Sequence, residues 1–229
     1  ASVNFSEKYR TPVILLLDEV IGHMRERLVL REPGELELVE RLRTSVPKDV
    51  DYHPYLPRED GRLPMSDFGD EHRYNVTGLY HDMWGFPTSS PKIVNGLLRH
   101  LMDKIDNRVH EITRYKEHYM DGAEYVLVSY GASARSAIHL ARSRRRRGEP
   151  IGVIELQTLW PFPAHLIREK CRAAKAVLVV EMNMGQVLHQ VRAAVAEPER
   201  VFLVNRFDGM LITPTNIQQI IRVIQGRGM

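Results

Sequence analysis

The chain has 229 residues, of which 43% are hydrophobic and 27% are charged. These are the proportions of an ordinary globular protein, and they exclude a disordered tail, a collagen-like repeat and a low-complexity linker. The formal net charge of +3 is modest, and much of the positive excess lies in one cluster, Arg142 with residues 144–147, so the charge does not predict binding to nucleic acid.

Residues 1–30 predict the end of a helix followed by a buried strand. Residues 4–10 have the composition of a helix end, and residues 12–18 (PVILLLD) are apolar on both faces. A strand of that kind is typical of the interior of a parallel sheet that helices cover on both sides. One such strand cannot form a sheet, so we expect either that the chain was cut from a longer one or that a partner completes the layer.

The next segment, residues 31–119, predicts a long irregular connection. Prolines and glycines interrupt it repeatedly, and its charged and aromatic residues follow no steady period. Connections of this length are uncommon unless they are functional or packed on a partner. Within it, residues 92–112 carry an apolar stripe at helical spacing, which predicts a helix that closes the connection.

From residue 120 onward the pattern is regular. Apolar runs typical of strands alternate with helical patterns, which predicts right-handed crossovers and a parallel sheet. The predicted strands are 125–130, 151–156, 176–181 and 201–205, and the predicted helices are 133–147, 163–173, 185–196 and 215–225. Thr213 or Thr215 could cap the last helix.

Ligands of an open parallel sheet bind at the loops that follow the carboxyl ends of its strands. Three loops occupy such positions, 131–135, 157–163 and 181–186, and their candidate interface or ligand residues are Gly131, Ser133, Arg135, Asn183, Gly185 and Gln186. Backbone N–H groups after Gly131 could bind an anion, but a turn with a serine cap is the simpler interpretation. For Asn183 to Gln186, helix capping and contact with a ligand or a neighbouring domain are equally compatible with the sequence.

A further candidate lies in the connection, where His81 and Asp82 stand between Tyr80 and Trp84 and close to two glycines. This composition is typical of a loop that closes over a polar substrate, because an imidazole can donate or accept a proton near neutral pH. Neighbouring His and Asp side chains also often do no more than hydrogen-bond locally. Both interpretations stay open from the residues alone.

Metal binding is not predicted, because the ten histidines are scattered and no metal-binding motif surrounds them. The single cysteine, Cys171, cannot form an internal disulfide, and it cannot hold an iron–sulfur cluster without other donors. The longest apolar runs are too short to cross a bilayer, and residues 1–12 lack a signal-peptide pattern. We therefore expect a cytoplasmic protein without membrane contact, and any redox centre on another chain.

With these motifs in order, the chain resembles the α subunit of the 2-oxoacid:ferredoxin oxidoreductases, most closely the C-terminal portion of the 2-oxoglutarate type. Five blocks carry the resemblance in the order of the family: 6–26, 77–82, 128–135, 158–163 and 179–186.

The resemblance implies an α/β fold in three parts. Residues 1–30 would be the C-terminal end of a pyrimidine-binding thiamine domain, residues 31–119 a connector with a helix, and residues 120–229 a transketolase C-terminal-like parallel-sheet domain. The front of the pyrimidine-binding domain, including the family's cofactor-activating glutamate, has no counterpart in this sequence, so we expect the chain alone to be inactive.

The implied reaction is the oxidative decarboxylation of a 2-oxoacid with coenzyme A, which yields acyl-CoA, CO2 and reduced ferredoxin. In the family, thiamine diphosphate performs the difficult step, and a β subunit holds this cofactor with Mg²⁺ and a [4Fe–4S] cluster. The resemblance therefore implies a β subunit and ferredoxin as partners, is compatible with additional small subunits, and implies no cofactor bound by this chain alone.

On the same resemblance, His81 and Asp82 are the candidates for contact with the distal carboxylate of the substrate or for gating its access. Because an aspartate would repel a dianionic substrate, we expect His81 to make the direct contact. An alternative is a non-catalytic assembly module whose C-terminal sheet only docks subunits.

Overall fold

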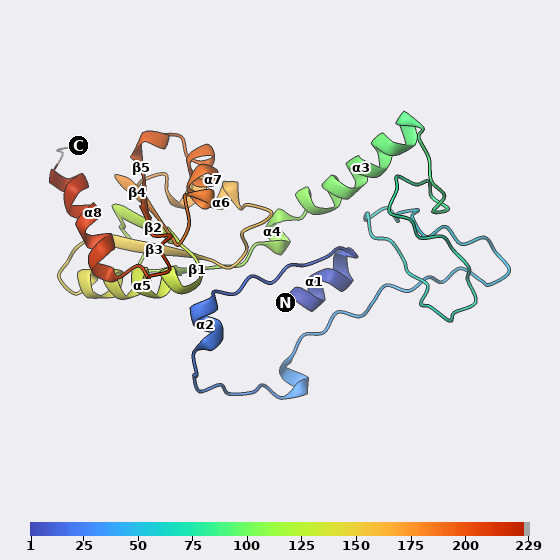
Figure 1. Cartoon of the computed structure of the whole chain (residues 1–229), viewed down its shortest axis with the longest axis horizontal. Helices are drawn as coiled ribbons and strands as arrows, with labels where there is room; N and C mark the ends of the chain where they lie inside the picture. Colours follow the sequence, from blue (N-terminus) through green and yellow to red (C-terminus); the bar gives the residue numbers. More distant parts are fainter. Residues whose placement is uncertain (227–229) are drawn as a thin grey trace. The chain divides into compact units, whose positions relative to one another are not determined.

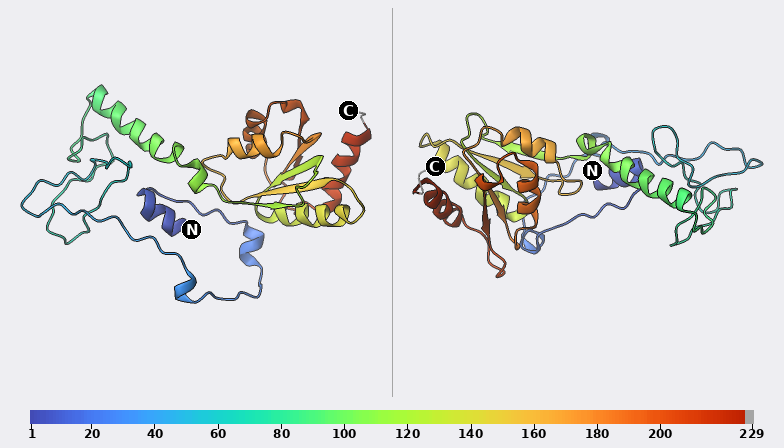
Figure 2. Two further views of the ribbon diagram at one scale, coloured as in Figure 1. Left: turned by 180° about the vertical axis from the view of Figure 1, so that it is seen from behind. Right: turned by 90° about the horizontal axis from the view of Figure 1, so that it is seen from above.

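The computed structural model describes residues 1–226, which fold as two compact units (Figures 1 and 2). The first unit comprises residues 1–16 and 26–108, and the second comprises residues 17–25 and the chain from Val109 onward. Each unit is described by itself. In the described part, no helix combines the length and the apolar character that a bilayer crossing needs.

The first unit contains two helices of more than one turn, α1 (Ser2–Tyr9) and α3 (Pro91–Asp106), and a 3-10 turn, η1 (Pro33–Glu35). Between residues 36 and 90, all of which are described, the chain forms no helix or ladder strand, and its only pairings are two isolated bridges. The first unit therefore depends on packing around a few buried side chains, which come from these residues and from both helices. The buried residues are Tyr9, Tyr52, Leu63, Ser66, Lys104 and Ile105.

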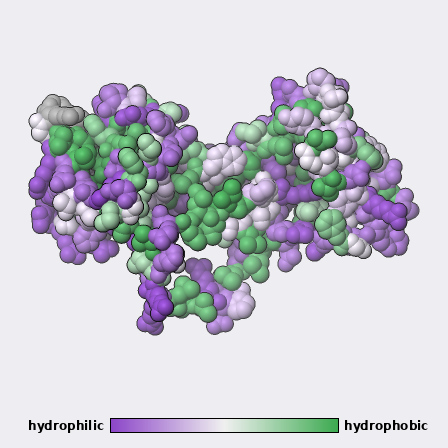
Figure 3. Space-filling model, viewed as in Figure 1, coloured by the Kyte–Doolittle hydropathy of each residue, from purple (hydrophilic) through white to green (hydrophobic). Residues whose placement is uncertain are grey.

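The strand expected at residues 12–18 is not formed. Residues 13–17 are described but pair with no neighbouring strand, and their side chains are exposed, with Ile14 at 82%. Figure 3 shows hydrophobic surface along this extended segment between α1 and α2. The apolar pattern expresses a preference for burial, but a strand also needs a neighbour to share its backbone hydrogen bonds, and these described residues have none.

The helix expected at 92–112 is interrupted. It ends at Asp106, and a short second helix, α4 (Val109–Ile112), follows after a turn. In this turn the backbone N–H of Arg108 donates to the carbonyl of Ile105 at 2.9 Å instead of that of Lys104. The Lys104 carbonyl accepts from the Arg108 guanidinium at 3.2 Å, so a side chain replaces the helical bond.

The second unit is built on a five-stranded sheet in the order β1-β3-β2-β4-β5. Its strands are β1 (Tyr115–His118), β2 (Tyr125–Ser129), β3 (Ile151–Leu156), β4 (Ala176–Glu181) and β5 (Val201–Asn205). Strands β2 to β5 are parallel, with Val128 opposite Ile154 on one side and Val179 on the other. The predicted parallel sheet is confirmed, and β1, which the sequence analysis missed, adds an antiparallel edge.

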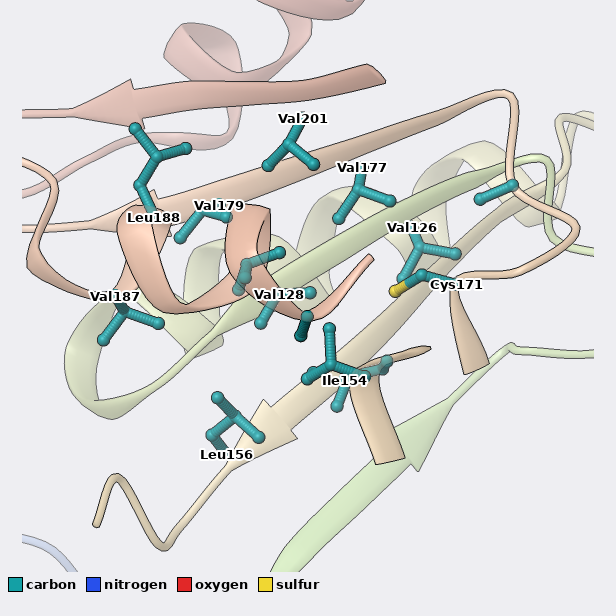
Figure 4. Close-up of a cluster of buried hydrophobic side chains, with 14 residues drawn as sticks. Val126, Val128, Ile154, Leu156, Cys171, Val177, Val179, Val187, Leu188 and Val201 are labelled. Carbon is teal, nitrogen blue, oxygen red and sulfur yellow. The ribbon is translucent and has the colours of Figure 1, made fainter. Parts of the chain in front are cut away.

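Helices cover both faces of this sheet, as Figures 1 and 2 show. The covering helices are α5 (Gly131–Arg145), α6 (Ala164–Lys170), α7 (Gln186–Ala194) and α8 (Pro214–Gly226). The unit also contains the short helix α2 (Glu19–His23), which buries none of its residues, and a 3-10 turn, η2 (Pro198–Arg200), before β5. Helices α5 and α8 pack on one face, and α6 and α7 pack on the other. Figure 4 shows the second of these cores, in which valines of β2 and β4 meet Val187 and Leu188 of α7. The Thr213 side chain accepts from the N–H of Asn216, so Thr213, and not Thr215, caps α8.

The strand order places a topological switch point at the centre of the sheet. From β2 the chain crosses to β3 on one side, and it then returns past β2 to β4 on the other side. The loops that follow β2 and β4 therefore diverge at neighbouring carboxyl ends, which is where α/β sheets bind their ligands.

Candidate functional site

A buried carboxylate lies at the switch point. Glu181, the last residue of β4, is fully buried, and its two oxygens accept hydrogen bonds from the backbone N–H groups of Val187 at 3.0 Å and Leu188 at 2.9 Å. These are unsatisfied donors of the first turn of α7, and a negative charge is favourable there. The carboxylate thus caps α7 from inside the domain.

Tyr130 joins the loop after β2 to the loop after β4. Its hydroxyl donates to Glu181 at 3.1 Å and accepts from the side-chain amide of Asn183 at 2.6 Å. Burial, and then the neighbouring Glu181 charge, raise the pKa of Tyr130 well above its ordinary value. The phenol is therefore a fixed hydrogen-bonding group at neutral pH and not a proton carrier.

The loop from Asn183 to Gln186 is ordered by its own amide. The Asn183 side-chain oxygen accepts from the N–H groups of Gly185 at 2.8 Å and Gln186 at 3.2 Å, and its carbonyl accepts from Asn205 at 2.8 Å. Gly185 has a φ of 100°, a left-handed conformation that favours glycine. Asn183 thus acts in capping, while the Gln186 side chain is exposed at the start of α7.

The start of α5 is capped by a carboxylate from a distant part of the same chain. The carboxylate of Asp18 accepts from the N–H of Ala132 at 2.6 Å, although the two residues are 114 positions apart. Gly131 has a φ of 56°, and a Cβ at this position would overlap the Asp18 carboxylate. The serine cap expected here is wrong: α5 begins at Gly131, so Ser133 lies buried inside its first turn, and the cap comes from Asp18.

The loops at the carboxyl edge also expose large side chains. Arg135 is exposed on α5 one turn after Gly131, while Trp160, Met184 and Phe207 are each about 70% exposed after β3, β4 and β5. Each of these loops therefore presents an apolar group beside its polar ones. Exposed apolar groups of this kind mark a surface suited to contact with another chain or segment.

His81 and Asp82 belong to the first unit and form a second candidate site. The Asp82 carboxylate accepts from the N–H groups of Trp84 at 2.9 Å and Phe86 at 3.1 Å, so it shapes the turn that contains it. The His81 imidazole lies against the ring of Tyr55, with 3.8 Å between the ring centroids, and its Nδ1 is 3.1 Å from the Asp82 carbonyl oxygen. Both residues are half-buried, which leaves the other imidazole nitrogen available to a ligand.

The residues described here do not fit a metal ion or an iron–sulfur cluster. Between residues 1 and 226, no three His, Cys, Asp or Glu side chains are grouped as metal ligands. Cys171 is buried in the apolar core, where its sulfur faces Val126 in Figure 4, and burial raises the pKa of its thiol to about 12. Because the thiolate is the form that binds metals, this cysteine is a core residue.

Sequence reasoning missed three residues of the switch-point site, Asp18, Tyr130 and Glu181. One signal was present, because Glu181 is a charged residue that directly ends an otherwise apolar run, AVLVVE. A charged residue is rarely fully buried unless it is paired, so its position after a buried strand pointed to a partner. Asp18 carried the same signal at the end of the run PVILLLD, whereas the sequence carried none for Tyr130.

Comparisons with known proteins agree with this architecture. The family model of the pyruvate:ferredoxin oxidoreductase core domain II matches residues 123–217. The 2-oxoglutarate synthase subunit KorA of Methanocaldococcus jannaschii is 34% identical over 219 residues, which are 95% of this chain and 57% of the relative. KorA of Methanothermobacter marburgensis is 36% identical over 215 residues, which are 93% of this chain and 56% of the relative.

Among solved structures, the 2-oxoglutarate:ferredoxin oxidoreductase from Magnetococcus marinus, with 2-oxoglutarate, coenzyme A and succinyl-CoA bound, matches with a TM-score of 0.87. The match covers 96% of this chain and 38% of that one, at 23% identity, and it confirms the α/β fold class. The chain spans a little more than half the length of the curated relatives, 56–57%. Residues 123–217 thus match the model of the pyruvate:ferredoxin oxidoreductase core domain II, and the resemblance of the chain to 2-oxoacid:ferredoxin oxidoreductase α subunits is confirmed.

Proposed function

We propose that the chain is part of the α subunit of a thiamine-dependent 2-oxoacid:ferredoxin oxidoreductase that acts on 2-oxoglutarate. The complete enzyme would convert the 2-oxoacid and coenzyme A to acyl-CoA and CO2 and transfer the electrons to ferredoxin. One observation carries the proposal, the 34–36% identity to two KorA subunits across at least 93% of this chain.

In this proposal, thiamine diphosphate, Mg²⁺ and the [4Fe–4S] cluster are held by a β subunit. One feature of the described residues supports this division: Cys171, the single cysteine of the chain, is a buried thiol of the apolar core. The chain itself would contribute to the wall of the shared pocket. Its division into residues 1–30, 31–119 and 120–229 remains part of the proposal.

The switch-point loops would form the face of the second unit that meets the β subunit. Asn183 and Glu181 fix the backbone of one loop, and Asp18 fixes the start of the other. Because these bonds already fix the loops, the loops would lose little conformational entropy on binding, and this favours a stable interface. Gly131, Ser133 and Gly185 would act through backbone shape, whereas Arg135 and Gln186 would act through their exposed side chains.

His81 would contact the distal carboxylate of the substrate. The ring of Tyr55 supports one face of the imidazole, and Nδ1 donates to the Asp82 carbonyl, so Nε2 would donate to the carboxylate in the imidazolium form, which carries a proton on both nitrogens. The Asp82 carboxylate is already bonded to two backbone N–H groups, and it would position the loop without touching the substrate.

The test uses the complete α subunit assembled with its β subunit, with ferredoxin reduction measured as a function of 2-oxoglutarate and coenzyme A. His81→Phe keeps a ring against Tyr55 but has no N–H, and we expect it to raise KM for 2-oxoglutarate at least tenfold. Asp82→Asn keeps the acceptor oxygen of the turn and should stay active, whereas Asp82→Ala should lose activity. His189→Ala, an exposed histidine on α7, is the matched control.

The possible outcomes separate the parts of the proposal. A wild-type complex without 2-oxoglutarate-dependent reduction of ferredoxin would contradict the function itself. An active complex in which His81→Phe leaves KM unchanged would contradict the site assignment, and if all these variants stay fully active, the chain serves as a non-catalytic assembly module.

A further inference from the structure

The end of α5 carries more positive charge than the surrounding residues neutralise. Five arginines, Arg142 and residues 144–147, lie in the last turn of the helix and just beyond it. Glu149 pairs with Arg144. In the described chain, none of Arg142, Arg145, Arg146 and Arg147 forms an ion pair with a carboxylate, so four guanidinium charges remain uncompensated.

The helix terminus does not account for this cluster. Cations are favourable at the carboxyl end of a helix because the last carbonyl groups lack partners. Here three of the last four carbonyls accept from the backbone, that of Arg142 from Arg146 at 3.4 Å, that of Arg144 from Arg147 at 2.9 Å and that of Arg145 from Gly148 at 3.0 Å. Like charges one turn apart, as at Arg142 and Arg146, also repel each other.

The arginines line an open hollow of about 500 Å³ together with Tyr119. Its lining residues are Tyr119, Arg142, Arg145 and Arg146, and none of them carries a carboxylate. This size lies in the range that small-molecule sites occupy, roughly 300–1,000 Å³. The hollow is therefore a cationic site with one aromatic wall.

The backbone of Tyr119 and the hydrogen bonds of Arg145 define the geometry of this hollow. Tyr119 has a φ of 58°, a left-handed conformation that is uncommon for a bulky residue and that occurs preferentially at functional sites. Its hydroxyl accepts from Nε of Arg142 at 3.3 Å, and its carbonyl accepts from Arg145. Arg145 also donates to the carbonyls of Ile151 and Asp121, so it is fixed at the base of the site.

The remaining guanidinium donors are free to bind a ligand. Arg142 donates only through Nε, which leaves its two Nη groups, and the Arg146 side chain forms no hydrogen bond or ion pair in the described part of the chain. We propose that this hollow binds a phosphate-bearing ligand of nucleotide size. Arg142 and Arg146 pair with its phosphate oxygens, and its planar base lies against the ring of Tyr119. Guanidinium groups suit this role because their planar fork matches phosphate oxygens in pairs, and any base can stack on a tyrosine.

The experiment titrates the purified chain by calorimetry with ADP, pyrophosphate, adenosine and coenzyme A. We expect ADP and pyrophosphate to bind and adenosine not to bind. The comparison of ADP with coenzyme A distinguishes a free nucleotide from the phosphoadenosine end of a coenzyme. The double variant Arg142→Ala/Arg146→Ala should weaken ADP binding at least about tenfold, because it removes two charge-assisted contacts.

The matched control removes the same charge elsewhere on this unit. Arg172→Ala/Arg222→Ala deletes two exposed arginines that form no ion pair in the described chain, and it should change ADP affinity less than twofold. Circular dichroism before titration establishes that each variant is folded. The proposal is overturned if ADP and pyrophosphate do not bind the wild type, or if both double variants weaken binding equally. It is also overturned if a hexaglutamate peptide binds more tightly than ADP, because the cluster is then a docking surface for an acidic protein.

Discussion

Replacing Glu181 with alanine should destabilise the second unit more than any surface substitution. The change removes a fully buried acceptor of three hydrogen bonds, two from backbone N–H groups of α7 and one from Tyr130. At about 1.5 kcal/mol for each bond to a charged group, the loss is about 4–5 kcal/mol. Relief of the cost of burying a carboxylate offsets part of this, leaving a net loss of about 3 kcal/mol, a large fraction of the ~5–15 kcal/mol stability of a domain.

Equilibrium unfolding in urea measures this loss. The chain has two tryptophans, Trp84 in the first unit and Trp160 in the second, so a Trp84→Phe background lets Trp160 fluorescence report the second unit alone. Glu199→Ala, an exposed glutamate before β5, is the control and should change the free energy of unfolding by less than about 0.5 kcal/mol.

Tyr130→Phe provides a second arm, because it removes only the hydroxyl between Glu181 and Asn183. We expect this variant to cost about 1–2 kcal/mol alone and less in the Glu181→Ala background, because the two residues share one network. A cost below about 1 kcal/mol for Glu181→Ala, or strictly additive costs in the double variant, would refute the assignment of Glu181 as the internal cap of α7.

Three further predictions test other parts of the structure. Gly131→Ala should destabilise the second unit by more than about 1 kcal/mol, because the φ of this residue is positive and the added Cβ would overlap the Asp18 carboxylate. Asp18→Ala should relieve part of that cost when the unfolding of the double variant is measured. Cys171 should react with Ellman's reagent at pH 8 at least about a hundredfold more slowly in the folded chain than in urea, because burial raises the pKa of its thiol to about 12; equal rates would contradict its burial. Burial, and then the charge of Lys104, lower the pKa of His100 from its ordinary 6.5. The stability that this group contributes is therefore present above pH 6.5 and is lost as the pH falls through the folded pKa. An NMR titration should give a midpoint below 6.5, and His100→Leu should flatten the pH dependence of unfolding.

Strands with uniform local character could be predicted from the sequence. The runs at β3, β4 and β5 are apolar and bounded by turn residues, and the predicted bounds of all three agree with the structure. β1 was missed because its sequence, YKEH, has no apolar face, as suits an edge strand whose Glu117 pairs with Lys170 at 2.9 Å. Residues 13–17 show the opposite error, because a strongly apolar run predicted a strand that has no neighbour within the described chain.

The candidate site was predictable only where its interactions are local. Asn183 caps residues two and three positions ahead, and capping was one of the two roles with which the sequence was compatible. Asp18 and Tyr130 act on partners 114 and 51 positions away, and no periodicity connects such distant positions. The same limit applies to the hollow at the end of α5, because the sequence shows its arginines but not their junction with Tyr119.

The solvent-facing segment from Val13 to Leu17 has a practical consequence for work with this polypeptide. Short stretches of adjacent β-branched and aliphatic residues without charge are sites at which separate molecules form intermolecular β-structure and precipitate. Production of the isolated polypeptide should therefore give aggregates that increase with concentration. Substitution of Leu15 by lysine, or co-expression with the remaining subunits, should restore solubility, and Leu15→Lys is therefore the background for calorimetry and unfolding of the isolated chain.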